Sequence, residues 1–147
     1  MLAPLPQTGC FDGARHLFAV RVYFEDTDLS GVVYHANYLR WFERARSDML
    51  RLAGIDQRAA HDAGEGAYAV TDLTLRYLRP ARLDDAVAVI SRVAEVSPAT
   101  CRLDQQAWRG EELLCSAGVR VAFVAPSGRP RRQPAPWVAA FRALLEE

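Results

Sequence analysis

The chain has 147 residues and a mass of 16.4 kDa, a length that predicts one domain able to bury about 68–70% of its unfolded surface. Half of the residues are hydrophobic, and 18 basic residues balance 18 acidic ones. This composition excludes the basic excess of a nucleic-acid-binding domain and the polar bias of a disordered chain. All 18 basic residues are arginine, so reactions that need a lysine amine, such as Schiff-base formation, are excluded.

The cysteine content indicates a reducing compartment. Cys10, Cys101 and Cys115 are odd in number and widely spaced, with no CxxC pair, so we expect reduced and mostly buried thiols. Residues 1–16 lack the basic and apolar regions of a signal peptide, and no apolar run reaches the roughly 20 residues that span a bilayer. These features predict a cytoplasmic protein without a membrane span.

The first half of the chain contains one predicted strand and one long predicted helix. After a loose segment over residues 1–16, apolar and polar side chains alternate over Leu17–Glu25, which predicts a half-buried strand. Apolar residues then recur at helical spacing over Asn37–Ala53, with arginines largely filling the other positions. Gly54 follows directly and is suited to end this helix.

The second half predicts an antiparallel sheet. Residues Ile55–Gly66 are polar and contain glycine, so they are predicted to form a connection. Four strands with tight turns follow, over Ala67–Leu78, Ala86–Val96, Thr100–Trp108 and Leu113–Val124. A proline-rich link over Ser127–Pro134 leads to a short amphipathic helix that begins near Pro136. The order of elements predicts a single α+β domain over residues 1–147, with one sheet wrapped on one helix.

The segment Glu25–Tyr38 places a carboxylate, a glycine and a histidine directly before the long helix. The first turn of a helix has unpaired N–H groups and a partial positive charge, which suit a developing oxyanion. Asp28 supplies a base or nucleophile beside these donors, and the pattern indicates a small hydrolytic site. The competing interpretation is that Asp26 and Asp28 only stabilise a turn before the helix, and we favour that role for Asp26.

A family resemblance rests on four motifs, which are Glu25–Asp28, Gly31–His35, Asn37–Tyr38 with Phe42–Arg46, and Arg79–Asp85. They resemble the hot-dog acyl-CoA thioesterases, specifically the 4-hydroxybenzoyl-CoA thioesterase group and its Tol-Pal-associated bacterial branch. The resemblance implies a five-stranded antiparallel sheet around one long helix and hydrolysis of a coenzyme A thioester. It also implies a homodimer or homotetramer with active sites at the dimer interface.

The resemblance also implies roles for individual residues. Asp28 matches the catalytic aspartate, as a base for water or as a nucleophile, and a backbone N–H near His35 would bind the oxyanion. The His35 side chain would orient substrate or water, and the helix acid Glu43 would support catalysis. The loop residue Gly31 and the aromatic Tyr34 are expected to bind substrate. Because coenzyme A carries phosphates, arginines should line the entrance; by position the preferred candidates are Arg79 and Arg82, and Arg76, Arg129, Arg131 and Arg132 are alternatives.

The chemistry itself makes modest demands. A thiolate leaving group with a pKa near 8.5 needs little protonation, so one carboxylate and a set of oxyanion donors can suffice. No cofactor is expected, because coenzyme A is part of the substrate. The three histidines, His16, His35 and His61, lack the spacing of metal ligands, so no metal is expected either.

Two other functions compete with thioester hydrolysis. A hot-dog hydroxyacyl dehydratase would carry a His-Phe-Pro type loop, whereas this chain has His35 followed by Ala36 and Asn37. A non-catalytic acyl-CoA sensor or scaffold would carry an added helical segment for DNA, and the proline-bearing residues 1–16 are too short for one. Hydrolysis of an acyl-CoA is therefore the preferred hypothesis.

Overall fold

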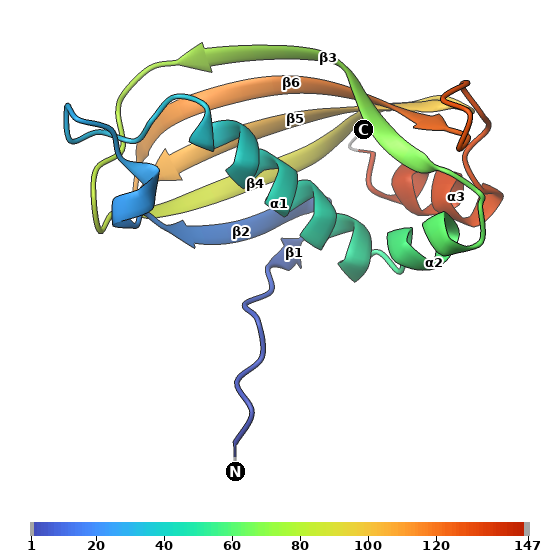
Figure 1. Ribbon diagram of the computed structural model, residues 1–147, viewed down its shortest axis with the longest axis horizontal. Coiled ribbons are helices and arrows are strands. Elements are labelled where there is room, and N and C mark those ends of the chain that lie inside the picture. Colours follow the sequence, from blue (N-terminus) through green and yellow to red (C-terminus); the bar gives the residue numbers. More distant parts are fainter. Residues whose placement is uncertain (1, 146–147) are drawn as a thin grey trace.

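The computed structural model describes residues 2–145 as a six-stranded antiparallel sheet that curves around one long helix (Figure 1). The strand order is β1-β2-β4-β5-β6-β3. The strands are β1 (Cys10–Asp12), β2 (Arg15–Arg21), β3 (Ala67–Tyr77), β4 (Ala86–Val96), β5 (Thr100–Arg109) and β6 (Glu112–Val124), and the helices are α1 (Asn37–Leu52), α2 (Gln57–Asp62) and α3 (Ala135–Ala143), with a 3-10 turn at Phe24–Asp26. The predicted α+β hot-dog architecture is confirmed, with one strand more than the five expected.

The helix α1 lies against the inner face of the sheet (Figure 1). Its buried residues recur every three or four positions, as Tyr38, Trp41, Phe42, Ala45 and Met49, so they form a single apolar face. Inward-facing residues of β4, β5 and β6 meet this face and complete the core, among them Val87, Val89, Leu103, Leu114 and Val119. The predicted helix is confirmed, and Gly54 adopts the left-handed conformation that ends it, with φ of +86°.

The four predicted strands after the helix are also confirmed, with ends that agree to within one residue. The first strand is the exception, because β2 spans Arg15–Arg21 rather than Leu17–Glu25. The chain leaves the sheet after Val22 and forms the 3-10 turn, where the Asp26 carboxylate accepts a hydrogen bond from the Tyr23 N–H at 2.8 Å. Phe24 consequently lies on the surface, 82% exposed. The alternation of apolar and polar residues extends past the end of β2 because Phe24, a turn residue, is apolar.

The segment before residue 17 is more ordered than predicted. Cys10–Asp12 pairs with β2 as a hairpin, and His16 is fully buried with Nε2 2.7 Å from Asp48 Oδ2 of α1. The Gly9 N–H donates to the same carboxylate oxygen at 2.9 Å. A side chain at position 9 would come within 2.1 Å of the Leu17 carbonyl oxygen. Residues 2–8 are exposed and extend away from the domain (Figure 1).

The structure corrects the predicted connection Ile55–Gly66, which contains the short helix α2. Asp56 caps it by accepting a hydrogen bond from the Ala59 N–H at 2.9 Å. The predicted C-terminal helix is confirmed as α3, and its Phe141 is buried against the core. The described residues contain no helix long and apolar enough to cross a membrane.

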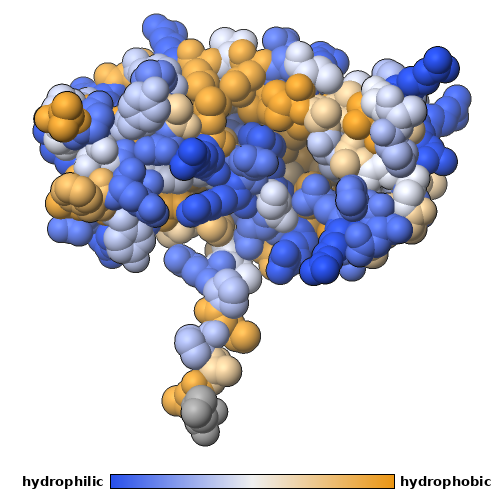
Figure 2. All heavy atoms as spheres, viewed as in Figure 1, coloured by the Kyte–Doolittle hydropathy of each residue, from blue (hydrophilic) through white to orange (hydrophobic). Residues whose placement is uncertain are grey.

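One edge of the sheet is long and partly apolar. The eleven-residue strand β3 pairs with β6 on one side only, so a row of its backbone groups is open. Val70 and Leu73 are 50% and 39% exposed on this strand. Figure 2 shows hydrophobic atoms gathered along the top of the molecule, over β3.

Candidate active site

The Asp28 loop is a tight hairpin that leads into α1. Residues 26–28 run antiparallel to residues 32–34, with hydrogen bonds from the Asp28 N–H to the Val32 carbonyl and from the Tyr34 N–H to the Asp26 carbonyl. Gly31 turns the tip with φ of +83°, a conformation that is strained for other residues. The Asn37 side chain donates to the Asp26 carbonyl at 2.8 Å, which ties the hairpin to the first turn of the helix.

Asp28 presents an exposed, ionised carboxylate at the tip of this hairpin. Its Oδ1 accepts hydrogen bonds from the Ser30 hydroxyl at 2.5 Å and from the Ser30 N–H at 2.8 Å. These bonds, the hydroxyl first, hold the pKa of Asp28 below its ordinary value. Ser30 leaves Oδ2 unengaged. The side chain therefore stabilises a turn, and it is also ionised and accessible to water at neutral pH.

The start of α1 offers two adjacent hydrogen-bond donors. Within residues 2–145, the backbone N–H groups of His35 and Ala36 donate to no acceptor, whereas those of Tyr34 and Asn37 donate to carbonyl oxygens. His35 follows Val32, which lies opposite Asp28, by three positions, so about 10 Å of extended backbone leads from the Asp28 pairing to these donors. Free N–H groups at a helix N-terminus favour negative charge, and an exposed carboxylate lies in the same segment.

Aromatic side chains cluster at the start of α1. The rings of Tyr34 and His35 lie 4.5 Å apart, and Tyr77 from the end of β3 meets the His35 ring edge-on at 6.3 Å. The Tyr77 hydroxyl donates to the His35 carbonyl oxygen at 2.8 Å. Tyr34 is 47% exposed and the His35 side chain is exposed, so both sequence-predicted residues face the open side of the site.

The segment that follows β3 forms the wall beside the hairpin. The Val33 N–H donates to the Ala81 carbonyl at 2.8 Å, and Val32 pairs with Arg82 through the backbone. Arg82 is exposed next to the hairpin, as a residue that binds a coenzyme A phosphate would be. Arg79 lies in the same segment, but its guanidinium pairs with Glu112 at 3.2 Å.

Asp85 holds this wall in place. Its carboxylate accepts hydrogen bonds from the Arg82 N–H at 2.8 Å and from the Arg109 guanidinium at 2.8 Å. Burial is the largest single influence and would raise the pKa of Asp85, but the hydrogen bonds from Arg109 and from the Arg82 N–H, together with the charges of both arginines, outweigh it and the pKa is lowered. Asp85 is therefore ionised, and its role is to hold the segment around Arg82 in place.

Glu43 stands apart from the other predicted site residues. It lies six residues into α1, about 9 Å along the axis from Asn37, and is exposed. No described contact links it to Asp28 or His35. Its charge acts instead on Arg46, whose guanidinium donates to Gln105 in the core at 2.9 Å.

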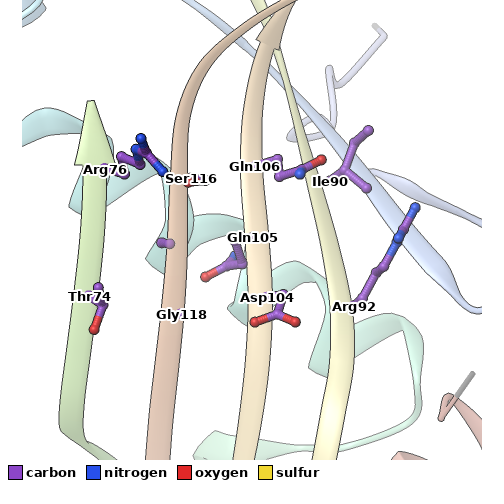
Figure 3. A pocket seen from close by; sticks show the side chains of 10 residues that line it. Thr74, Arg76, Ile90, Arg92, Asp104, Gln105, Gln106, Ser116 and Gly118 are labelled. Atoms are coloured by element: carbon purple, nitrogen blue, oxygen red, sulfur yellow. The ribbon is translucent and has the colours of Figure 1, made fainter. Parts of the chain in front are cut away.

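A groove of about 430 Å³ occupies the outer face of the sheet, on the side away from α1 (Figure 3). Gly118 and Ser116 lie along its floor, with Arg76 and Arg92 on β3 and β4, the two strands that flank it (Figure 3). Arg76 is one of the alternative candidates for binding coenzyme A phosphates; Asp28, His35 and the other predicted site residues do not line the groove. Among the described residues, no three His, Cys, Asp or Glu side chains come together as metal ligands.

Sequence reasoning did not assign roles to Tyr77, Asn37 or Tyr38. Tyr77 reads only as a strand residue, and its contact with His35 joins positions 42 residues apart. Tyr38 accepts a hydrogen bond from the Ala81 N–H at 3.1 Å and so links the helix to the wall segment. Asn37 and Tyr38 were part of the recognised motif, which was the available signal for them.

The curved sheet around α1 and the site at the N-terminus of that helix define a hot-dog thioesterase. Residues 30–116 match the Thioesterase superfamily, and the chain belongs to this family. The acyl-CoA thioesterase YbgC of Haemophilus influenzae is 44% identical over 107 residues, 73% of this chain and 79% of the relative. The acyl-CoA thioester hydrolase YbgC of Escherichia coli O6:H1 is 40% identical over 125 residues, 84% of this chain and 92% of the relative.

Solved structures give the same result for the fold. A structure named "Probable Thioesterase from Bartonella henselae" has a TM-score of 0.77 and 36% identity, and the match covers 82% of this chain and 99% of that one. A 1,4-dihydroxy-2-naphthoyl-CoA thioesterase from Synechocystis has a TM-score of 0.81 at 23% identity, over 87% and 96% of the two chains. The latter likeness concerns the fold alone.

Proposed function

We propose that this protein hydrolyses acyl-CoA thioesters to a free carboxylic acid and coenzyme A, with Asp28 as the catalytic carboxylate. The observation that carries the proposal is the single segment in which an exposed, ionised Asp28 precedes two free N–H groups, those of His35 and Ala36. Membership of the thioesterase superfamily and relatives named acyl-CoA thioesterases at 40–44% identity support the reaction.

The reaction begins when the thioester carbonyl oxygen accepts hydrogen bonds from the His35 and Ala36 N–H groups. Asp28 either removes a proton from the attacking water or attacks the carbonyl carbon itself to form a mixed anhydride that water then hydrolyses. The carbon–sulfur bond breaks and coenzyme A leaves as a thiolate, which needs no general acid because the pKa of a thiol is near 8.5. No cofactor takes part.

The substrate enters along the wall segment. Tyr34 and the His35 ring contact the thioester region, Gly31 keeps the hairpin tip clear of a side chain, and Arg82 binds a coenzyme A phosphate as a bidentate cation. Arg79 binds a coenzyme A phosphate after its guanidinium leaves Glu112. This exchange costs little free energy because the ion pair lies on the surface. Glu43 supports catalysis indirectly, through orientation, and takes no part in the chemical steps.

We also propose that two copies associate through β3 and that the enzyme works in the cytoplasm as a homodimer or homotetramer. The open backbone of β3 and its exposed Val70 and Leu73 support the pairing. The two buried thiols, Cys101 and Cys115, are free, which supports a reducing compartment.

The decisive experiment measures free-thiol release from a panel of acyl-CoAs by the wild type and by Asp28→Asn. Asparagine keeps the size of the side chain and removes its basicity, so kcat should fall by two to four orders of magnitude, roughly the range for a positioned base. Circular dichroism verifies that the variant is folded. A folded variant with turnover within about threefold of wild type on the best substrate would refute the role of Asp28.

A single-turnover reaction in ¹⁸O-labelled water tests whether the Asp28 carboxylate forms a covalent intermediate. If Asp28 is the nucleophile, water attacks the anhydride and the label enters either the acid product or the Asp28 side chain. Label in the side chain, found by mass spectrometry of the peptide that contains residue 28, identifies the covalent route. Label only in the product shows that water attacks the acyl carbon, which the general-base route requires and the acyl side of the anhydride also allows.

A further inference from the structure

The peptide group between His35 and Ala36 is held by a side chain from a distant strand. The Tyr77 hydroxyl at the end of β3 donates a hydrogen bond of 2.8 Å to the His35 carbonyl oxygen. Its ring is fixed in turn by an edge-on contact with Tyr38, with centroids 5.6 Å apart. The Tyr77 hydroxyl therefore belongs to a ring that packs against the first turn of α1.

This bond also sets the direction of a donor. In a trans peptide the carbonyl and the following N–H point in opposite directions, so fixing the His35 carbonyl aims the Ala36 N–H away from Tyr77. The neighbouring plane is fixed differently, because the Tyr34 carbonyl accepts the Asn37 N–H at 2.9 Å and thereby directs the His35 N–H. Of the two free N–H groups, only that of Ala36 has its direction set by a hydrogen bond from a side chain.

We propose that Tyr77 is a positioning residue that presets the oxyanion site by locking the His35–Ala36 peptide plane. The proposal rests on the function argued above, in which the two N–H groups bind the thioester oxygen. Preset donors need no reorientation as charge develops on that oxygen, and this is the main source of their effect on rate. Tyr77 acts through the backbone and contacts neither the attacking water nor the scissile bond.

The state of the hydroxyl fits this role. Burial, and secondarily the nearby Cys115, raise the pKa of Tyr77 above its ordinary value, so the phenol stays protonated and remains a donor throughout the neutral range. Tyr77 is 46% exposed, and its ring contacts the rings of His35 and Tyr38. Removing only the oxygen therefore leaves the ring packing in place.

The test compares Tyr77→Phe with Tyr68→Phe, which removes a hydroxyl from the same strand. Tyr68 donates to Gln133 at 2.6 Å at the other end of β3. Losing a whole oxyanion donor costs about 10²–10³ in kcat, and a donor that is present but no longer held should cost part of this. We expect Tyr77→Phe to lower kcat about tenfold with KM within about twofold, and Tyr68→Phe to keep the wild-type kcat.

Two further measurements separate positioning from plain stability. A trifluoromethyl ketone analogue of the substrate, which adopts the tetrahedral geometry, should bind Tyr77→Phe about tenfold more weakly, while a non-hydrolysable thioether analogue binds both variants like wild type. In ¹⁵N spectra the Ala36 amide should shift in Tyr77→Phe and not in Tyr68→Phe.

The outcomes are distinct. A wild type that releases no thiol from any acyl-CoA would overturn the proposed function. A wild type that is active beside a Tyr77→Phe variant with unchanged kcat would overturn the role of Tyr77 alone. An unshifted Ala36 amide in Tyr77→Phe would overturn that role whatever the activity.

Discussion

The carboxylate of Asp28 is exposed and has a lowered pKa, and the hydrogen bonds from Ser30 are the main cause. Because its pKa in the folded protein is depressed below 3.8, the ionised form persists through the neutral range and is lost only as the pH falls through that lowered value. A reaction that needs ionised Asp28 therefore retains its base at every pH above about 5. The hydroxyl of Ser30 is the largest contributor.

Replacing Ser30 with alanine should raise the pKa of Asp28 toward 3.8, because the variant keeps the backbone donor and loses the stronger side-chain donor. A ¹³C titration of the side-chain carboxyl reports this value directly. Ser47→Ala on the exposed part of α1 serves as the control. An Asp28 pKa that moves equally in both variants, or not at all, would contradict the assigned cause.

The two predicted carboxylates should differ in importance. Glu43 lies well along α1 from the donors and touches neither Asp28 nor His35, so Glu43→Gln should lower kcat/KM about tenfold at most, through altered orientation. Asp28→Asn should cost far more. Measuring both variants with one acyl-CoA gives the order. If the folded Glu43→Gln variant is the more impaired, the helix acid is the catalyst and Asp28 is a turn residue.

At the level of secondary structure, the long elements were predictable because their side-chain period follows from geometry. The helix α1 and strands β3 to β6 repeat their apolar positions over ten or more residues, so chance matches are few. The short elements were missed for the opposite reason. The helix α2 is six residues long and the strand β1 three, so neither is long enough to show a repeat of apolar positions in the sequence.

The cap of α2 offers a clean test of that explanation. Asp56→Ala removes the acceptor for the Ala59 N–H and should lower the free energy of unfolding by about 1 kcal/mol, the usual value of an N-cap. Asp56→Asn retains an acceptor and should be nearly neutral. Urea denaturation of the three proteins provides the comparison, and equal losses in both variants would mean that the cap does not stabilise α2.

The residues of the candidate site also differ in how far they could be predicted from the sequence. The segment Glu25–Tyr38 was found because its carboxylate, glycine and donors are neighbours in the sequence. Tyr77 was not found from the sequence, because its hydroxyl bonds to a residue 42 positions away. Only the register of β3 against β6 and the packing of α1 bring Tyr77 and His35 together. Local chemistry is visible in a sequence, whereas support from another strand requires the fold.

For the whole molecule, the open edge of β3 should decide the assembly. Lysine on an edge strand opposes pairing with another chain, so Leu73→Lys should convert the wild-type dimer or tetramer into a monomer of about 16.4 kDa. Light scattering at micromolar concentration measures the mass. Leu52→Lys places the same charge on an exposed leucine of α1 and should leave the assembly intact. A wild type that is itself monomeric would refute the pairing through β3.

The anchor of Gly9 on Asp48 marks the point on the chain before which foreign sequence can be attached. Upstream of it the described residues 2–8 are exposed, whereas at Gly9 itself a single added methyl group would strike the Leu17 carbonyl. A purification handle or a surface tether joined ahead of residue 9 would leave the domain undisturbed. Moved a few residues further, the same fusion would pull the buried His16 and the end of α1 apart.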